Sequence, residues 1–240
     1  TVLIGLIRSS ENPMATRFEL RAPNPKSNTY LVLAVSYMAM IDGIKAALGA
    51  EKTANELELS LSKKCGDADF YLEKDREYRS EKDVFEDFSE EERTKLFGKA
   101  PQTVWENLKG LSAYPEKAHT IMGDGVITPI SLESYEQSIL SQWKTELHNR
   151  IIPNHMTFVR ECRRIHGDDA THYDLENWAK IDRMRHYIAK DSLHEKSLLT
   201  RASEALDKDD YDLASDLQIE MSQKIEQLRK LYLTYKRNLF

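Results

Sequence analysis

Three charged residues near the N-terminus have the spacing that chemistry on a β-strand would need. Arg17, Glu19 and Arg21 alternate with Phe18 and Leu20, and alternate side chains of a strand project from one face. A carboxylate is a hard oxygen ligand for Mg²⁺ or Mn²⁺, and guanidinium groups bind phosphate and carboxylate oxygens bidentately. The row could therefore neutralise a polyphosphate and the acid that it activates. Alternating charges are also typical of a solvated strand face, and the spacing alone favours that simpler interpretation.

The segments around this row are predicted to form two strands and one long helix. Residues 2–7 are apolar and partly β-branched, which indicates a buried strand, and residues 17–21 alternate with period two. Prolines then end the second strand, because proline cannot donate a hydrogen bond to a neighbouring strand. Asn28 or Ser27 is the expected N-cap of a helix over residues 30–48. That helix is apolar nearly all round, so we expect it to be buried on most sides.

Beyond residue 52 the periodicity is helical. The predicted fold class is therefore α+β and mostly helical: a short antiparallel strand pair, a helical body and a C-terminal antiparallel helical hairpin or bundle. Amphipathic helices are expected near 52–64, 89–98, 102–110 and 131–148. Pro153 is expected to interrupt the helical pattern, which continues in further helices before and after residue 167. The last two of these helices are expected to be joined by a turn at 207–212. Gly167-Asp168-Asp169 marks the predicted boundary between domains at 1–166 and 167–240.

The bulk composition excludes some partners. The 240 residues carry a formal net charge of −6, which argues against nucleic acid because phosphate binding needs a basic face. The longest apolar run, residues 31–41, is about half of the ~20 residues that a membrane span requires, so no membrane partner is expected. The two cysteines, Cys65 and Cys162, form no disulfide or zinc pattern, which favours a cytoplasmic location. The start directly at an apparent core strand predicts a piece excised from a longer protein.

A longer stretch around the charged row carries a family resemblance. Residues 17–31 read RFELRAPNPKSNTYL, which is similar to the glutamine synthetase motif R-[IF]-E-x-R-x-P-D-P-x-x-N-P-Y-L. Residues 38–45, MAMIDGIK, follow in register and resemble that family's M-A-G-L-D-G-I-K. Residues 123–143 resemble a C-terminal segment of the family less tightly. The sequence is thus identified as a C-terminal portion of a glutamine synthetase catalytic domain, with the resemblance spanning roughly residues 1–160 and with C-terminal helices typical of divergent long forms.

The resemblance implies an activity and roles for four residues. Glutamine synthetases are glutamate–ammonia ligases: they use ATP and Mg²⁺ or Mn²⁺ to join ammonia to glutamate through γ-glutamyl phosphate, and they work as homo-oligomeric rings. By position, Glu19 resembles a metal-ligating glutamate and Arg21 the arginine that contacts glutamate and the transferring phosphoryl group. Arg17 resembles an arginine on the nucleotide phosphates, and Arg8 another phosphate-side arginine at shorter spacing than is usual.

Two departures from the motif are visible: Asn24 stands in place of aspartate and Thr29 in place of proline. The family's other metal-ligating acids lie upstream of this motif, so the chain by itself is expected to be inactive. Two alternatives stay open. One is a non-catalytic regulatory or oligomerisation module of a glutamine-synthetase-like protein. The other is a ligase that joins glutamate to an amine other than ammonia.

Overall fold

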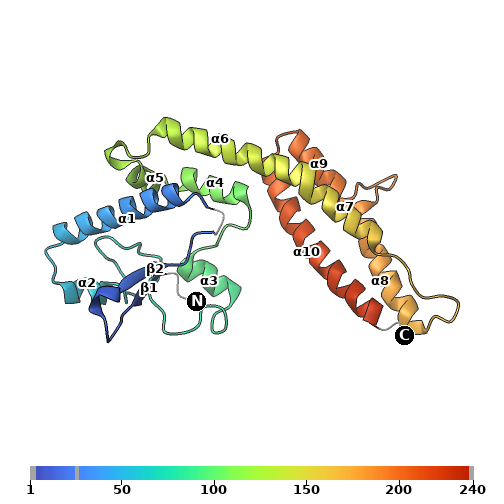
Figure 1. Ribbon diagram of the computed structural model, residues 1–240, viewed down its shortest axis with the longest axis horizontal. Coiled ribbons are helices and arrows are strands. Elements are labelled where there is room, and N and C mark those ends of the chain that lie inside the picture. The colour runs from blue at the N-terminus through green and yellow to red at the C-terminus, as the bar shows by residue number, and fades with distance from the viewer. Residues whose placement is uncertain (1–3, 25–26, 238–240) are drawn as a thin grey trace. The chain divides into compact units, whose positions relative to one another are not determined.

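Helices dominate the protein, which a computed structural model describes over residues 4–24 and 27–237 (Figure 1). The strands are β1 (Ile4–Ile7) and β2 (Arg17–Leu20). The helices are α1 (Thr29–Gly49), α2 (Ala54–Ser60), α3 (Glu90–Phe97), α4 (Val104–Ala113), α5 (Pro115–Ile121), α6 (Pro129–Glu146), α7 (Ile152–Glu161), α8 (His172–Ala189), α9 (Leu198–Asp207) and α10 (Tyr211–Arg237), with 3₁₀ turns at Pro13–Ala15 and Gly123–Gly125. This confirms the predicted fold class, a mostly helical α+β protein with one short antiparallel strand pair.

Residue contacts divide the chain into two compact units. Unit 1 comprises Thr1–Ala100 and Pro115–Thr128, and unit 2 comprises Pro101–Tyr114 and Pro129–Phe240. The boundary predicted at 166/167 concerns which residues belong to the family domain, and it stays a prediction. In packing terms, α6 and α7, which precede it, share unit 2 with α8, α9 and α10.

The two strands of unit 1 form a hairpin, as the predicted antiparallel strand pair requires. β1 and β2 pair antiparallel, with Gly5 opposite Glu19 and Ile7 opposite Arg17. The loop between them is closed by Asn12, whose side chain accepts a hydrogen bond from the Met14 backbone N–H at 3.1 Å. Both predicted strands are therefore confirmed, the first over its described residues, with residues 2 and 3 outside those described, and the second as far as Leu20, one residue short of the predicted end.

Helix α1 begins where the sequence predicts it. The Asn28 side chain accepts hydrogen bonds from the backbone N–H groups of Tyr30 and Leu31, at 3.0 and 3.3 Å. It thereby satisfies two of the donors that the first turn of a helix leaves free. The helix ends at Gly49, and Glu51 just beyond it has a left-handed φ of 52°.

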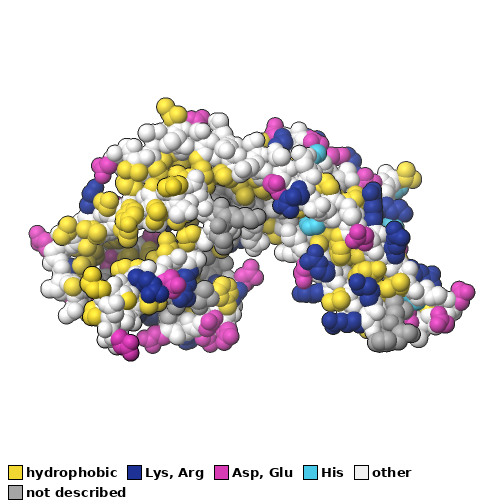
Figure 2. Space-filling model, in the orientation of Figure 1, with side chains coloured by type: hydrophobic (Ala, Val, Ile, Leu, Met, Phe, Trp, Pro, Cys, Tyr) yellow, Lys and Arg dark blue, Asp and Glu magenta, His cyan; other side chains and the backbone are white. Residues whose placement is uncertain are grey.

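The prediction that this helix is buried on most sides is wrong. Met38 is its only buried residue. Most of its other large apolar side chains are exposed, among them Leu31, Leu33, Val35, Tyr37, Met40, Ile41, Ile44 and Leu48. Figure 2 shows hydrophobic side chains gathered over this helix. The reason is that α5 packs on one side of α1 and the described part of unit 1 provides no second layer for the rest.

By length and composition alone α1 could cross a membrane, a property that it shares with core helices of soluble proteins. Only 6% of its most apolar window is buried. Met38 and Ala118 are the only buried apolar side chains in the described part of unit 1. At about 1.5–3 kcal/mol for each fully buried large side chain, that burial is too small to balance the entropy of ordering the unit. Unit 1 therefore has the surface of a domain that lacks its covering layer.

Unit 2 has the core that unit 1 lacks. Residues from α6 to α10 form one buried apolar cluster: Trp143, Leu147, Val159, Cys162, Ile181, Ile188, Leu198, Leu199, Ala202, Ala205, Leu206, Ala214, Leu217, Met221, Ile225, Leu228 and Tyr235. The predicted antiparallel C-terminal bundle is confirmed, with α9 and α8 both packed on α10 and a turn between α9 and α10 as expected. Buried polar contacts fix its register: the hydroxyls of Thr103 and Ser215 lie 2.6 Å apart, and Trp143 Nε1 donates to Gln218 Oε1 at 2.7 Å.

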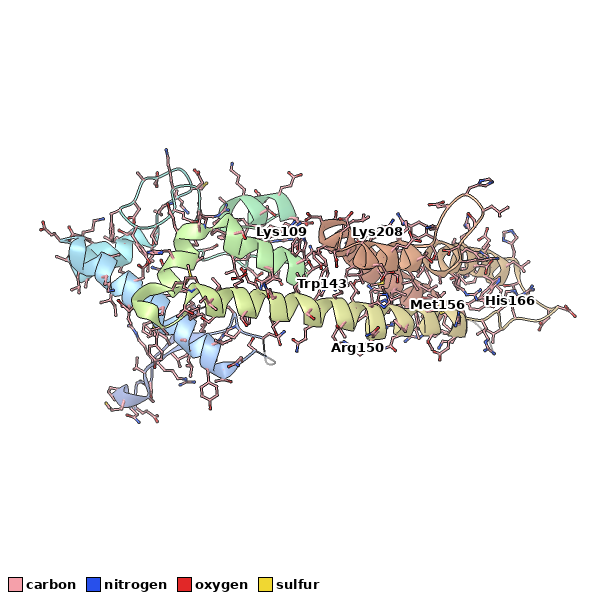
Figure 3. All side chains as sticks on the ribbon, turned by 90° about the horizontal axis from the view of Figure 1, so that it is seen from above. Lys109, Trp143, Arg150, Met156, His166 and Lys208 are labelled. Atoms are coloured by element: carbon pink, nitrogen blue, oxygen red, sulfur yellow. The ribbon has the colours of Figure 1, made fainter. Side chains whose placement is uncertain are left out.

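The interruption predicted at Pro153 is also wrong. α6 passes into α7 through a π-helical turn at Leu147–Ile151, and Pro153 lies in the first turn of α7. The Ile152 N–H bonds to the Leu147 carbonyl, five residues earlier. This wider turn directly before Pro153 accommodates the hydrogen bond that proline cannot make, so the helix continues instead of breaking. Figure 3 shows Trp143, Arg150 and Met156 following one another along this continuous segment.

Candidate functional site

The charged row lies on one face of the hairpin, as its spacing predicts. Arg17 and Glu19 are two residues apart on β2 and project on the same side. Glu19 is opposite Gly5, which has no side chain to compete for the space beside the carboxylate. Arg21 follows one residue after the end of β2. The hairpin therefore presents a carboxylate with an arginine on either side of it in sequence.

Glu19 and Arg21 are in direct contact. Arg21 donates from Nε and from Nη2 to the same oxygen, Glu19 Oε2, at 3.1 and 2.7 Å. Among the described residues Glu19 Oε1 accepts no hydrogen bond, so it is available to another ligand. The Arg21 guanidinium lowers the pKa of the Glu19 carboxyl below its ordinary value, first through this hydrogen bond and then through its charge, with a smaller contribution from Arg17. The carboxylate is therefore held in its ionised, metal-binding form.

The two remaining arginines stand apart from this pair. Arg17 is exposed on the strand face, and it contributes to the pKa of Glu19 through its charge alone. Arg8 follows the last residue of β1 and is also exposed. Within the described residues, Arg8 forms no ion pair with the row. The hairpin thus brings Glu19 and Arg21 together and leaves Arg17 and Arg8 open to an anion.

The donor set is incomplete for a divalent metal. Mg²⁺ requires about six oxygen ligands in near-octahedral geometry. Over residues 4–24 and 27–237, no three His, Cys, Asp or Glu side chains converge on a point that could hold a metal ion. Glu19 fits the role of one oxygen ligand, and the arginines fit the role of phosphate contacts. These residues do not make a complete metal site by themselves.

Contacts that no sequence pattern indicated hold the loops of unit 1 against α1. Tyr71 Oη donates to Asp42 Oδ2 at 2.7 Å, and this bond raises the pKa of Tyr71 to about 12. Lys45 lies 3.7 Å from Asp124 in the turn after α5. The partners are tens of residues apart in the chain, so no local signal could have revealed them.

The Met122–Gly125 turn is fitted closely to the helix. A Cβ atom added to Gly123 would lie 3.2 Å from Met38 Cε, which is tighter than most contacts of real Cβ atoms. Met38 is the buried residue of α1, so the turn covers that part of the helix.

Comparison with known proteins supports part of the resemblance read from the sequence. Residues 2–66 match the family model described as the glutamine synthetase catalytic domain. No curated protein and no solved structure matches significantly. The matched segment contains the hairpin, α1 and α2. It supports the resemblance of this segment to a glutamine synthetase catalytic domain and, in outline, a ligase-type function. The looser resemblance predicted as far as residue 160 stays a prediction.

Proposed function

We propose that this chain is part of a glutamine synthetase that joins ammonia to glutamate with ATP, and that its hairpin contributes one metal ligand and several phosphate contacts to the active site. The family match over residues 2–66 carries the proposal. The reactive row lies inside the match, and the match also contains α1, which supports the interpretation of that apolar helix as part of an enzyme domain.

The proposed roles follow from the chemistry of each side chain. Glu19 supplies one carboxylate oxygen to Mg²⁺ or Mn²⁺, and the bound ion would screen charge on the phosphates. Arg21 holds Glu19 ionised and in one orientation, and it contacts the glutamate substrate and the transferring phosphoryl group. Arg17 and Arg8 bind nucleotide phosphate oxygens through their guanidinium groups.

The described residues by themselves are proposed to be inactive. They supply a single carboxylate ligand, and the exposed apolar surface of α1 and the open edges of the hairpin need further polypeptide to cover them. We propose that additional strands of the catalytic domain cover this surface, within a homo-oligomer in the cytoplasm. This arrangement would also provide the remaining metal ligands.

Two substitutions in the full-length protein test these roles. We expect Glu19→Ala and Arg21→Ala each to lower the rate of glutamine formation from glutamate, ammonia and MgATP by about 100-fold or more. Glu19→Ala should in addition weaken Mn²⁺ binding, measured by calorimetry. Glu11→Ala is the matched control, because Glu11 is an exposed acid of the same hairpin loop and lies outside the row. Near-wild-type rates in both row variants would refute the assignment.

The same assay addresses the two alternatives. If the wild-type protein consumes ATP with glutamate and a primary amine such as methylamine, but not with ammonia, the protein is a ligase for another amine. A complete lack of turnover in the full-length protein favours a non-catalytic module. One observation favours that second candidate: unit 2 has its own buried core, and among its described residues no three His, Cys, Asp or Glu side chains converge on a possible metal site.

A further inference from the structure

A basic groove runs between α8 and α10 in unit 2. It has a volume of about 390 Å³ and is lined by six residues: Lys180, Arg183, Met184 and Tyr187 from α8, and Lys224 and Leu231 from α10. Met184 and Leu231 are half-buried and give the groove an apolar floor. Lysine and arginine side chains gather on this face of the unit (Figure 2).

The three cations of the groove have no acidic partner among the described residues. Lys180 and Arg183 lie one turn apart on the same face of α8 and are exposed, and Lys224 is half-buried beside the Tyr187 ring, 5.9 Å from its centroid. Three acids of the two helices pair with groups outside the groove: Glu176 with His172, Asp182 with Arg185 and Glu226 with Arg229. Glu220 accepts a hydrogen bond from Tyr187, which lines the groove, so this carboxylate lies at the edge of the groove. A row of unpaired cations above an apolar floor fits an acidic ligand that also carries a hydrophobic group.

The chain itself contains a segment with the opposite pattern. Residues 83–92, here called the acidic segment, read DVFEDFSEEE. Its Phe85 ring is 65% exposed, and the Arg93 guanidinium lies 5.5 Å from the centroid of the ring. Glu86, Glu90 and Glu91 are exposed and pair with no cation among the described residues. Asp83 fixes the local conformation by accepting hydrogen bonds from the backbone N–H groups of Phe85 and Glu86, at 2.8 and 3.1 Å.

We propose that the acidic segment of a second copy of this chain docks in the basic groove. Phe85 packs on Met184 and Leu231, and the free carboxylates of the segment pair with the cations of the groove. The groove is built from two packed helices. The acidic segment has a local turn of its own and the N-cap of α3, where Ser89 accepts from the Glu92 N–H at 3.2 Å, and both reduce the conformations that it must lose on binding. This inference is independent of the proposed enzymatic activity.

The contact joins different surfaces of the two copies. It is therefore heterologous, and repetition of the same contact closes into a ring or continues as an open chain. Because the contact depends on several partly exposed ion pairs, it should weaken as salt screens them.

Sedimentation velocity of the full 240-residue chain tests the proposal. We expect association that increases with protein concentration and falls steeply between about 50 and 300 mM NaCl. The charge reversal Lys180→Glu/Arg183→Glu should weaken association at least tenfold. The matched control Lys208→Glu/Lys230→Glu introduces the same change in net charge outside the groove and should associate like the wild type. Circular dichroism confirms that each variant is folded.

A charge swap decides whether the two surfaces meet. The variant Glu90→Lys/Glu91→Lys should also fail to associate by itself, whereas its mixture with Lys180→Glu/Arg183→Glu should restore association between the two variants through a reversed ion-pair set. Three results would overturn the proposal: a wild-type monomer at all concentrations, association unaffected by the groove variant, or a mixture that stays dissociated. If the acidic segment bound the groove of its own chain instead, the wild type would stay monomeric at all concentrations.

Discussion

Removal of one hydroxyl, in Tyr235→Phe, should destabilise unit 2 substantially. The Tyr235 ring is fully buried on α10, and its Oη accepts hydrogen bonds from the backbone N–H groups of Ile165 and His166, at 3.1 and 3.3 Å. The same oxygen contacts His166 Nδ1. Arg164 Nε donates to His166 Nε2 at 2.7 Å, which holds the His166 ring in place. The hydroxyl thus fixes the loop between α7 and α8.

The magnitude follows from the donors that the substitution leaves without a partner. Phenylalanine keeps the packing of the ring, so the hydrophobic contribution is nearly unchanged. Each buried donor left unsatisfied costs about 1–3 kcal/mol, and the exposed side of Ile165 lets water replace one bond. One buried donor then stays unsatisfied, so we expect Tyr235→Phe to lower the free energy of unfolding by about 1–3 kcal/mol. For a unit of this size, that corresponds to a fall in Tm of roughly 3–12 °C.

Urea and thermal unfolding followed by circular dichroism at 222 nm measure the effect, because unit 2 holds nearly all of the buried core. Tyr232→Phe is the matched control. Its Oη bonds to the Arg163 N–H and the Glu161 carbonyl at 3.2 and 3.4 Å, in an exposed setting. We expect that variant to lose less than about 1 kcal/mol. An equal loss in both variants, or a Tyr235→Phe loss below about 0.5 kcal/mol, would refute the reasoning.

Three further predictions concern titratable groups. Burial raises the pKa of the Cys162 thiol to about 11, so at pH 8 a thiol reagent should label Cys65 in the folded chain and Cys162 only after denaturant is added; labelling of two thiols without denaturant would contradict this. Burial lowers the pKa of His155, so the folded state favours the neutral ring. Below about pH 6.5 the ring takes up a proton more readily in the unfolded chain than in the folded one, so the free energy of unfolding should fall as the pH decreases from there. His155→Gln should flatten the decline in the urea midpoint between pH 7 and 5.5, and a decline as steep as that of the wild type would show that other groups cause it. Tyr71→Phe removes the hydrogen bond that ties its loop to α1 and should increase tryptic cleavage within residues 63–79 several-fold; unchanged cleavage would mean that the remaining loop contacts suffice.

The sequence determined those features that depend on short-range chemistry. The Asn28 cap sets the start of α1 because its side chain bonds to backbone groups two and three residues away. The period-two alternation of residues 17–20 forms a strand, and the near-heptad apolar spacing of the C-terminal third forms the bundle. The charged row was also visible, because side chains two residues apart on a strand share a face whatever surrounds them.

Tertiary structure alone decided burial and pairing. An apolar helix such as α1 is covered only if another layer packs on it, and nothing within the helix encodes whether that layer is present. Likewise, Pro153 breaks a helix in isolation, but the π-helical turn before it is maintained because Leu147 and Trp143 are anchored in the core of unit 2. The basic groove depends on two helices whose cations lie more than 40 residues apart in sequence. Their proximity is a consequence of packing between α8 and α10, which local spacing does not specify.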